Sequence, residues 1–164
     1  MDRAVARGKL GWSQETRHVL FPAARDRPEK RFGLARAAVA EARASGVPIE
    51  LHELDGVGRD DVPLWLNGSD AVLLTSTHEG SPNVVKEALA CDVPVVSVDV
   101  GDVSERVAGV DGCHIAAATP GDLASKLLLA LSSQRPEARR AVEEIALPRI
   151  AERLQAIYET VAAR

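Results

Sequence analysis

Residues 71–98 read AVLLTSTHEGSPNVVKEALACDVPVVSV, and this stretch decides the fold. A short apolar run covers 71–76, and a second apolar run covers 93–99. Between them, the segment that starts at Pro82 has the apolar spacing of an amphipathic helix. Two such strands must lie parallel, because a helical crossover brings the chain back to the same end of the sheet. The stretch therefore predicts one unit of a parallel sheet.

The rest of the chain repeats this alternation of short apolar runs and helical segments. After Pro120 the pattern is helical to the end, with a break expected at Pro148. This rhythm predicts an α/β fold: a Rossmann-like, doubly wound parallel sheet of about five strands, with helices on both faces and a helical C-terminus. Further strands are expected at 18–23, 49–54 and 113–118, and further helices at 31–46, 62–69 and 102–109.

The composition is typical of one globular domain and excludes several classes of function. The 164 residues are 46% hydrophobic, 27% charged and only 3% aromatic, so an aliphatic core is expected. The formal net charge of −4 argues against a general electrostatic grip on nucleic acid. No apolar run reaches the length of a membrane span, and the N-terminus lacks the apolar region of a signal peptide. We therefore expect a cytoplasmic protein.

The loop at 75–81 and the start of the following helix carry candidate binding residues. Ligands of open α/β sheets bind outside the carboxyl ends of the strands, where helix N-termini direct free N–H groups outward. Glu79 belongs to that rim, while Ser81 is expected to cap the helix and Pro82 to occupy its first position. Capping does not explain Glu87, which lies two turns further on beside the apolar stripe. Taken alone, the two glutamates are better explained as ordinary surface charges, since most surface charge is structurally neutral.

The run THEGSPNVVKEALACDVPVVSVDVGDVSE resembles the E-x7-E segment of retaining nucleotide-sugar glycosyltransferases with the GT-B fold. This large group includes many bacterial polysaccharide and lipid glycosyltransferases. Glu79 and Glu87 match its two glutamates, and the helix is followed by its Pro-Val-Val strand. Upstream, Arg25 and Lys30 in FPAARDRPEKRF match the family's Arg-x4-Lys element after the first strand. The resemblance runs from about residue 10 to the last helix.

This resemblance implies a donor site for a nucleotide diphosphate-sugar, with Glu79, Arg25 and Lys30 as the expected catalytic residues. The two basic residues would stabilise the leaving diphosphate, together with backbone N–H groups, without a metal ion or other cofactor. Glu79 would accept hydrogen bonds from the donor sugar, and Glu87 would accept them from the ribose. The other expected donor contacts are Gly80, Ser81, Pro82 and Asn83, and the base pocket is expected near Asp55, Gly56 and Val57.

The resemblance also implies an incomplete enzyme. A GT-B glycosyltransferase has two Rossmann-like domains, and 164 residues suffice for one. We expect the chain to be the C-terminal, donor-binding domain, with residues 1–15 as an entering linker and 136–164 as C-terminal helices. A missing N-terminal domain would supply the acceptor site, and any peripheral membrane association would come only through the full-length enzyme. The fragment alone is therefore expected to be inactive.

Two alternatives remain open at this point. A nucleotide-sugar epimerase shares the two-domain architecture and would convert the donor without an acceptor. A non-catalytic, flavodoxin-like binding module would bind no nucleotide, although basic residues rather than an acidic cluster follow the first strand. Metal-dependent chemistry is not expected, because His52, His78 and His114 lack ligand spacing among themselves.

Overall fold

The computed structural model describes residues 1–162, and within them five parallel strands form one sheet. In space the strands follow the order β2-β1-β3-β4-β5. Every neighbouring pair is parallel, so the predicted doubly wound sheet is confirmed. The strands are β1 (Arg17–Phe21), β2 (Ile49–Glu53), β3 (Ala71–Leu74), β4 (Val95–Val98) and β5 (His114–Ala116).

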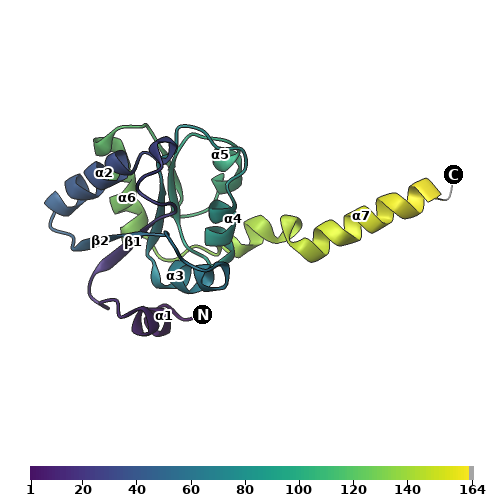
Figure 1. Cartoon of the computed structure of the whole chain (residues 1–164), viewed down its shortest axis with the longest axis horizontal. Coiled ribbons are helices and arrows are strands. Elements are labelled where there is room, and N and C mark those ends of the chain that lie inside the picture. Colours follow the sequence, from purple (N-terminus) through teal and green to yellow (C-terminus); the bar gives the residue numbers. More distant parts are fainter. Residues whose placement is uncertain (163–164) are drawn as a thin grey trace.

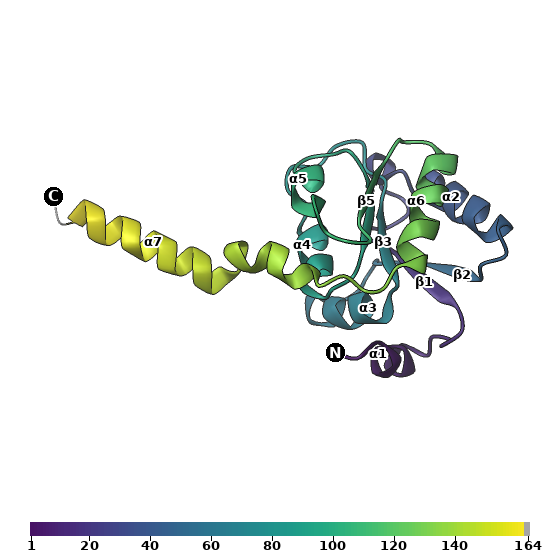
Figure 2. The ribbon, with the colours of Figure 1, turned by 180° about the vertical axis from the view of Figure 1, so that it is seen from behind.

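Helices cover both faces of the sheet (Figures 1 and 2). On one face α2 packs against α6, and α6 also contacts β3, β4 and β5. On the other face α3 contacts β1, and α4 contacts both β4 and α5. Because β3 and β4 are buried along their whole length, their residues are all apolar except Ser97 of β4. The helices are α2 (Phe32–Ala44), α3 (Val62–Gly68), α4 (Asn83–Ala90), α5 (Val103–Val107) and α6 (Pro120–Ser132).

The sheet order reverses between β1 and β3. From β1 the chain moves outward to β2, and it then crosses to β3 on the other side of β1. In a doubly wound sheet this reversal opens a crevice at the carboxyl ends of the two strands, since their connections leave toward opposite faces. The turns that follow β1 and β3 therefore border the expected ligand site. The short 3-10 helix η1 (Pro28–Lys30) lies in the first of these turns.

The first fifteen residues contain a helix that the sequence did not predict. Helix α1 (Arg3–Leu10) begins at Asp2, whose carboxylate accepts hydrogen bonds from two backbone N–H groups of the first turn. It packs against α3. The buried Arg7 side chain also pairs with Asp70, which lies just before β3. The segment expected to be an entering linker thus contains a helix that packs against α3.

At the other end, the chain leaves the domain as a long helix. The 3-10 helix η3 (Ala138–Ile145) contacts α4, and α7 (Leu147–Ala162) then extends away from the sheet (Figures 1 and 2). The expected break coincides with the start of α7, which has Pro148 in its first turn. Residues 163 and 164 of the predicted C-terminal helices lie outside the described residues. Among residues 1–162, no helix is both long enough and apolar enough to cross a membrane.

Candidate functional site

The turns after β1 and β3 are joined by hydrogen bonds at the point where the sheet order reverses. The Thr75 hydroxyl donates to the Lys30 carbonyl oxygen at 2.7 Å, and the Thr77 amide donates to the Glu29 carbonyl oxygen at 2.8 Å. In the other direction, the Arg31 guanidinium donates to the carbonyl oxygens of Thr75 and Ser76 at 2.5 and 3.0 Å. These bonds fix the two turns against each other. Sequence reasoning missed Arg31, whose backbone is left-handed at φ 54°.

Lys30 and Glu79 meet across this junction. The Lys30 ammonium lies 2.5 Å from a carboxylate oxygen of Glu79, and the Ser76 hydroxyl donates to the same oxygen at 2.6 Å. Both side chains of the ion pair are mostly buried, at 16% and 14% exposure. Burial alone would raise the pKa of Glu79, but the hydrogen bonds from Lys30 and Ser76 outweigh it and lower that pKa. The carboxylate is therefore ionised at neutral pH.

Arg25 lies in the same turn as Lys30 but is paired elsewhere. Its guanidinium makes two contacts with Glu53 at the end of β2, with N–O distances of 2.7 and 2.9 Å. The Arg25 side chain is 72% exposed and also lies over the Phe32 ring, 5.8 Å from its centroid. The structure thus brings Lys30, but not Arg25, to the E-x7-E loop. Sequence reasoning missed Glu53 as the partner of Arg25.

The start of α4 differs from the prediction by one residue. Pro82 is extended (ψ 121°) and occupies the N-cap position, so the helix begins at Asn83 and Pro82 is not its first helical residue. Ser81 does not cap the helix either, because its hydroxyl donates to a carboxylate oxygen of Asp102 at 2.6 Å. An ionised acceptor competes well with a neutral backbone cap. The hydrogen bond from Ser81 is also the main cause of a lowered pKa at Asp102.

Gly101, which follows β4, lies close against this loop. The Asp102 amide donates to the Gly80 carbonyl oxygen at 3.1 Å. The preceding residue, Gly101, has φ +57°, and a Cβ there would collide with the same carbonyl oxygen. The loop from Glu79 to Asn83 is therefore held against the turn after β4. In α4 the Val85 amide donates to the Pro82 carbonyl oxygen, while helix geometry leaves the amides of Asn83 and Val84 without a partner in the helix and directs them out of its N-terminal end.

A cavity of about 340 Å³ lies at the carboxyl ends of β3, β4 and β5. Its wall includes Arg31, Ser76 and Thr77 from the joined turns, together with Asp99 after β4. It thus shares Ser76 with the environment of Glu79. This is the edge of the sheet at which the sequence predicted a ligand.

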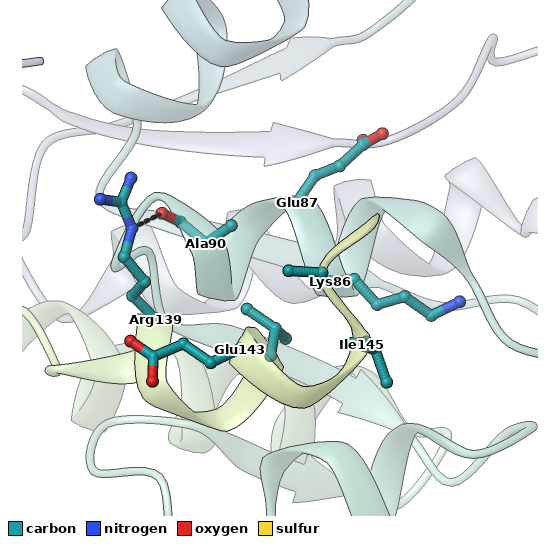
Figure 3. A pocket seen from close by; sticks show the side chains of 8 residues that line it. Lys86, Glu87, Ala90, Arg139, Glu143 and Ile145 are labelled. Carbon is teal, nitrogen blue, oxygen red and sulfur yellow. Dashed lines mark hydrogen bonds between the residues drawn. The ribbon is translucent and has the colours of Figure 1, made fainter. Parts of the chain in front are cut away.

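Glu87 lies apart from this cavity, about one turn along α4 from Asn83. It is half-buried and borders two cavities on either side of the helix, of about 350 and 400 Å³. The smaller one lies between α4 and η3, and its wall includes Arg139 and Glu143. Figure 3 shows that the Glu87 carboxylate is directed away from these two residues. There Arg139 donates to the Ala90 carbonyl oxygen at 3.0 Å.

The larger of the two cavities lies toward the predicted base pocket. It is lined by Glu87 together with Arg59, Asp60, Val62 and Pro63, from the 3-10 helix η2 (Arg59–Asp61) and the start of α3. The three residues expected to form the base pocket immediately precede this wall and do not line the cavity. Of these, Asp55 and Gly56 are exposed and Val57 is half-buried.

Several solved structures share the fold of this chain. The chain resembles half of a sucrose-phosphate synthase from Thermosynechococcus elongatus, with a TM-score of 0.77 and 16% identity over 99% of this chain and 49% of that one. It also resembles half of a glycosyltransferase from Rickettsia africae, with a TM-score of 0.70 and 15% identity over 97% of this chain and 51% of that one. HepE from Anabaena, solved in complex with UDP-glucose, is also similar, with a TM-score of 0.64 and 20% identity over 99% of this chain and 53% of that one. The chain therefore spans about half the length of these structural relatives.

Sequence comparison identifies the family itself. A search of curated protein sequences finds no match. A family profile described as "Glycosyl transferases group 1" matches residues 34–133, which is more than half of the chain. The matched region includes β3, α4 and the loop that carries Glu79. The chain therefore belongs to the glycosyl transferases of group 1.

Proposed function

We propose that the chain is the donor-binding half of a retaining glycosyltransferase and that it holds a nucleotide diphosphate-sugar outside the carboxyl ends of β1 and β3. The observation that carries this proposal is the Lys30–Glu79 ion pair, which joins the two turns at the reversal of the sheet. One member of the pair is cationic and suits a phosphate, while the other is an ionised acceptor that suits sugar hydroxyls. The N-terminus of α4 begins four residues after Glu79 and adds N–H donors for the same anion.

The leaving group determines which residues matter for transfer. As the bond from sugar C1 to the phosphate oxygen breaks, negative charge grows on the diphosphate. Lys30 and the α4 amides are fixed in position before this happens, and such preorganised charge stabilises a transition state efficiently. Arg25 would join them by exchanging Glu53 for a phosphate oxygen, since the Arg25 side chain is 72% exposed and solvent screens its side of the ion pair. No metal ion is needed for this stabilisation.

The acceptor hydroxyl forms its new bond to C1 on the face from which the diphosphate departs. Its proton passes to the departing phosphate oxygen, so the configuration at C1 is retained. Glu79 accepts hydrogen bonds from the donor sugar throughout and does not become the proton acceptor, because its pKa is lowered. Its role is to orient the sugar.

Glu87 and the neighbouring cavity of about 400 Å³ suit the nucleoside end of the donor. A carboxylate accepts two ribose hydroxyls at once, which an amide does not reproduce fully. The wall formed by Arg59, Val62 and Pro63 offers both an apolar surface and polar groups for a base. This assignment moves the proposed base pocket a few residues beyond Asp55, Gly56 and Val57.

A second domain completes the proposed enzyme. The chain spans about half of its structural relatives, and α7 leaves the domain with an uncovered apolar stripe. On this stripe Leu147, Leu154, Ile157, Tyr158 and Val161 are all about half exposed or more. The N-terminal domain of the same enzyme is the proposed partner of α7 and the source of the acceptor site. The isolated chain is accordingly expected to bind the donor weakly and to turn over little of it.

Amide chemical shifts in this chain test the proposal. Titration with uridine, guanosine and adenosine diphosphates should move the signals of residues 25–31 and 76–87 for at least one nucleotide. Inorganic phosphate at the same concentration is the control for non-specific anion binding. Shifts confined to other parts of the chain, or no response to any of the three nucleotides, would rule out the proposed donor site.

A further inference from the structure

A second cluster of potential ligands lies on the sheet, away from the β1–β3 rim. It consists of His18 on β1 and of Glu50 and His52 on β2. In the sheet register His18 is opposite Glu50, and His52 lies two residues after Glu50 on β2. Alternate residues of a strand face the same side, so the register brings all three side chains together. One ligand atom from each lies within 4.8 Å of the other two.

The hydrogen bonds of His18 determine where its lone pair points. The Nε2 atom of His18 lies 2.9 Å from the Ser13 carbonyl oxygen, which can only accept. In a neutral ring Nε2 therefore carries the proton, and Nδ1 is left unprotonated, with its lone pair directed at the cluster. At present this acceptor is used by His52, whose Nε2 lies 2.8 Å away. A backbone carbonyl that holds the remote N–H of a histidine is the usual outer partner of a metal-binding imidazole.

The position of Glu50 is not explained by hydrogen bonding. Its carboxylate oxygen lies 3.8 Å from Nδ1 of His18 and 3.7 Å from Nε2 of His52. Both distances are too long for a hydrogen bond. They are close to the separation of two ligands on one tetrahedral zinc ion, which is about 3.3 Å for zinc–ligand distances of about 2.0–2.1 Å. The three atoms thus outline one face of a tetrahedron, with edges of 2.8, 3.7 and 3.8 Å.

We propose that His18, Glu50 and His52 bind a divalent transition metal ion of the zinc type. Binding requires the two imidazole nitrogens to separate by roughly half an ångström. The His52 proton moves from Nε2 to Nδ1, so that both rings bind in the neutral form. A water molecule completes the tetrahedron on the side of Glu50, whose side chain is 53% exposed. Two imidazoles and one carboxylate are a ligand set that zinc uses elsewhere in proteins.

Aromatic rings hold the two histidines in place. Trp12 stacks on the His52 ring at a centroid distance of 3.8 Å and on the His18 ring at 4.8 Å. Trp65 from α3 meets Trp12 edge-on at 5.4 Å. A bound ion would therefore tie β1 and β2 together beneath the Trp12 segment, which leads from α1 into β1. The expected consequence is a more stable domain, independent of nucleotide binding and of the proposed transferase activity.

The sequence did not reveal this cluster. The spacing of His52 relative to His78 and His114 predicts no site, but the partner of His52 is His18, which lies 34 residues earlier. Because His18 comes from β1 while Glu50 and His52 come from β2, the spacing of ligands within a single segment does not reveal the cluster.

Calorimetric titration with Zn²⁺ after removal of metal by a chelator tests the site. We expect one Zn²⁺ per chain, affinity at least about tenfold weaker in Glu50→Gln, and loss of the site in His52→Gln. His78→Gln is the matched control, because His78 is exposed and lies outside the cluster. Since Glu50 is on the surface, Glu50→Gln should fold like the wild type and keeps the test valid even if His52→Gln does not. Unchanged binding in Glu50→Gln, or no binding by the wild type, would overturn the proposal.

Two local readouts separate this site from zinc bound elsewhere. The chain has two tryptophans, and both lie near His52, with Trp65 at a centroid distance of 6.4 Å. Cu²⁺, which quenches nearby indoles, should lower their fluorescence in the wild type and in His78→Gln but not in His52→Gln. Zn²⁺ should likewise raise the unfolding temperature of the first two proteins only. Equal quenching or equal stabilisation in His52→Gln would contradict the assignment.

Discussion

The Lys30 ammonium lies 2.5 Å from a carboxylate oxygen of Glu79, although 48 residues separate them in the sequence. The contact exists because β1 and β3 are neighbours in the sheet and the two residues follow these strands. It leaves a cation and an anion side by side at the rim where ligands of such sheets bind.

The lowered pKa of Glu79 makes part of the domain's stability dependent on pH. Below the ordinary value of 4.5, the unfolded chain binds a proton that the folded chain does not yet bind. The free energy of unfolding therefore falls as the pH falls from 4.5 toward the lower pKa of the folded state. Glu79→Gln should show a shallower decline in this range, measured by urea unfolding at several pH values. Glu152→Gln, which removes an exposed carboxylate from α7, is the control. An equal decline in wild type and Glu79→Gln would contradict the prediction.

Releasing Arg25 from Glu53 should strengthen the binding of a nucleoside diphosphate. An exposed ion pair is worth about 0.2–1 kcal/mol, so Glu53→Gln should improve affinity by at most about fivefold. Arg25→Ala should weaken affinity. In the Arg25→Ala background, Glu53→Gln should have no further effect, because the competing interaction is already absent. If Glu53→Gln changed the affinity equally in both backgrounds, Arg25 would not be the residue that it restrains.

The sheet was predictable from the sequence because its central strands are buried on both faces. β3 is an uninterrupted apolar run, β4 is apolar except for Ser97, and the crossover helices between strands show the expected period. Helix α1 was not predictable, because its docking depends on the distant Arg7–Asp70 pair rather than on an apolar stripe. The one-residue error at the start of α4 has a similar origin: the acceptor for Ser81 is Asp102, on another turn.

The candidate site was partly predictable, because a parallel sheet brings the ends of neighbouring strands to the same edge. Adjacent strand ends place Lys30 near the Glu79 loop once a parallel sheet is inferred. The sequence did not indicate that β2 would lie beside β1 and offer Glu53 to Arg25. It also did not indicate that Arg31 would bind the carbonyl oxygens of Thr75 and Ser76.

Gly101→Ala should impair both stability and nucleotide binding. Its positive φ strains any larger residue by about 1–3 kcal/mol, and its Cβ would also push against the Gly80 carbonyl oxygen. Gly109→Ala is a matched control, since Gly109 has φ +72° but nothing within 4 Å of an added Cβ. Thermal unfolding and nucleotide titration should show that both variants lose stability and that only Gly101→Ala weakens binding. Equal binding by the two variants would show that the loop at Gly80 is not part of the site.

Glu87→Gln should lower the preference for a nucleoside diphosphate over inorganic pyrophosphate. The proposed contact is with the ribose, so affinity for pyrophosphate should stay the same while affinity for the nucleotide falls several-fold. Competition between the two ligands measures this ratio directly. Glu143→Gln, on the wall of the cavity between α4 and η3, should leave the ratio unchanged. A parallel loss of both affinities in Glu87→Gln would instead indicate a contact with phosphate.

Calorimetric titration of uridine and guanosine diphosphates into wild type, Lys30→Met and Lys9→Met tests the central claim most directly. Lys9 is an exposed lysine of α1 and controls for the loss of one positive charge. Lys30→Met should weaken binding of the preferred nucleotide by about tenfold or more, because a charge-assisted phosphate contact is lost, while Lys9→Met should bind like the wild type. Equal affinities in Lys30→Met and the wild type would contradict a diphosphate site between β1 and β3.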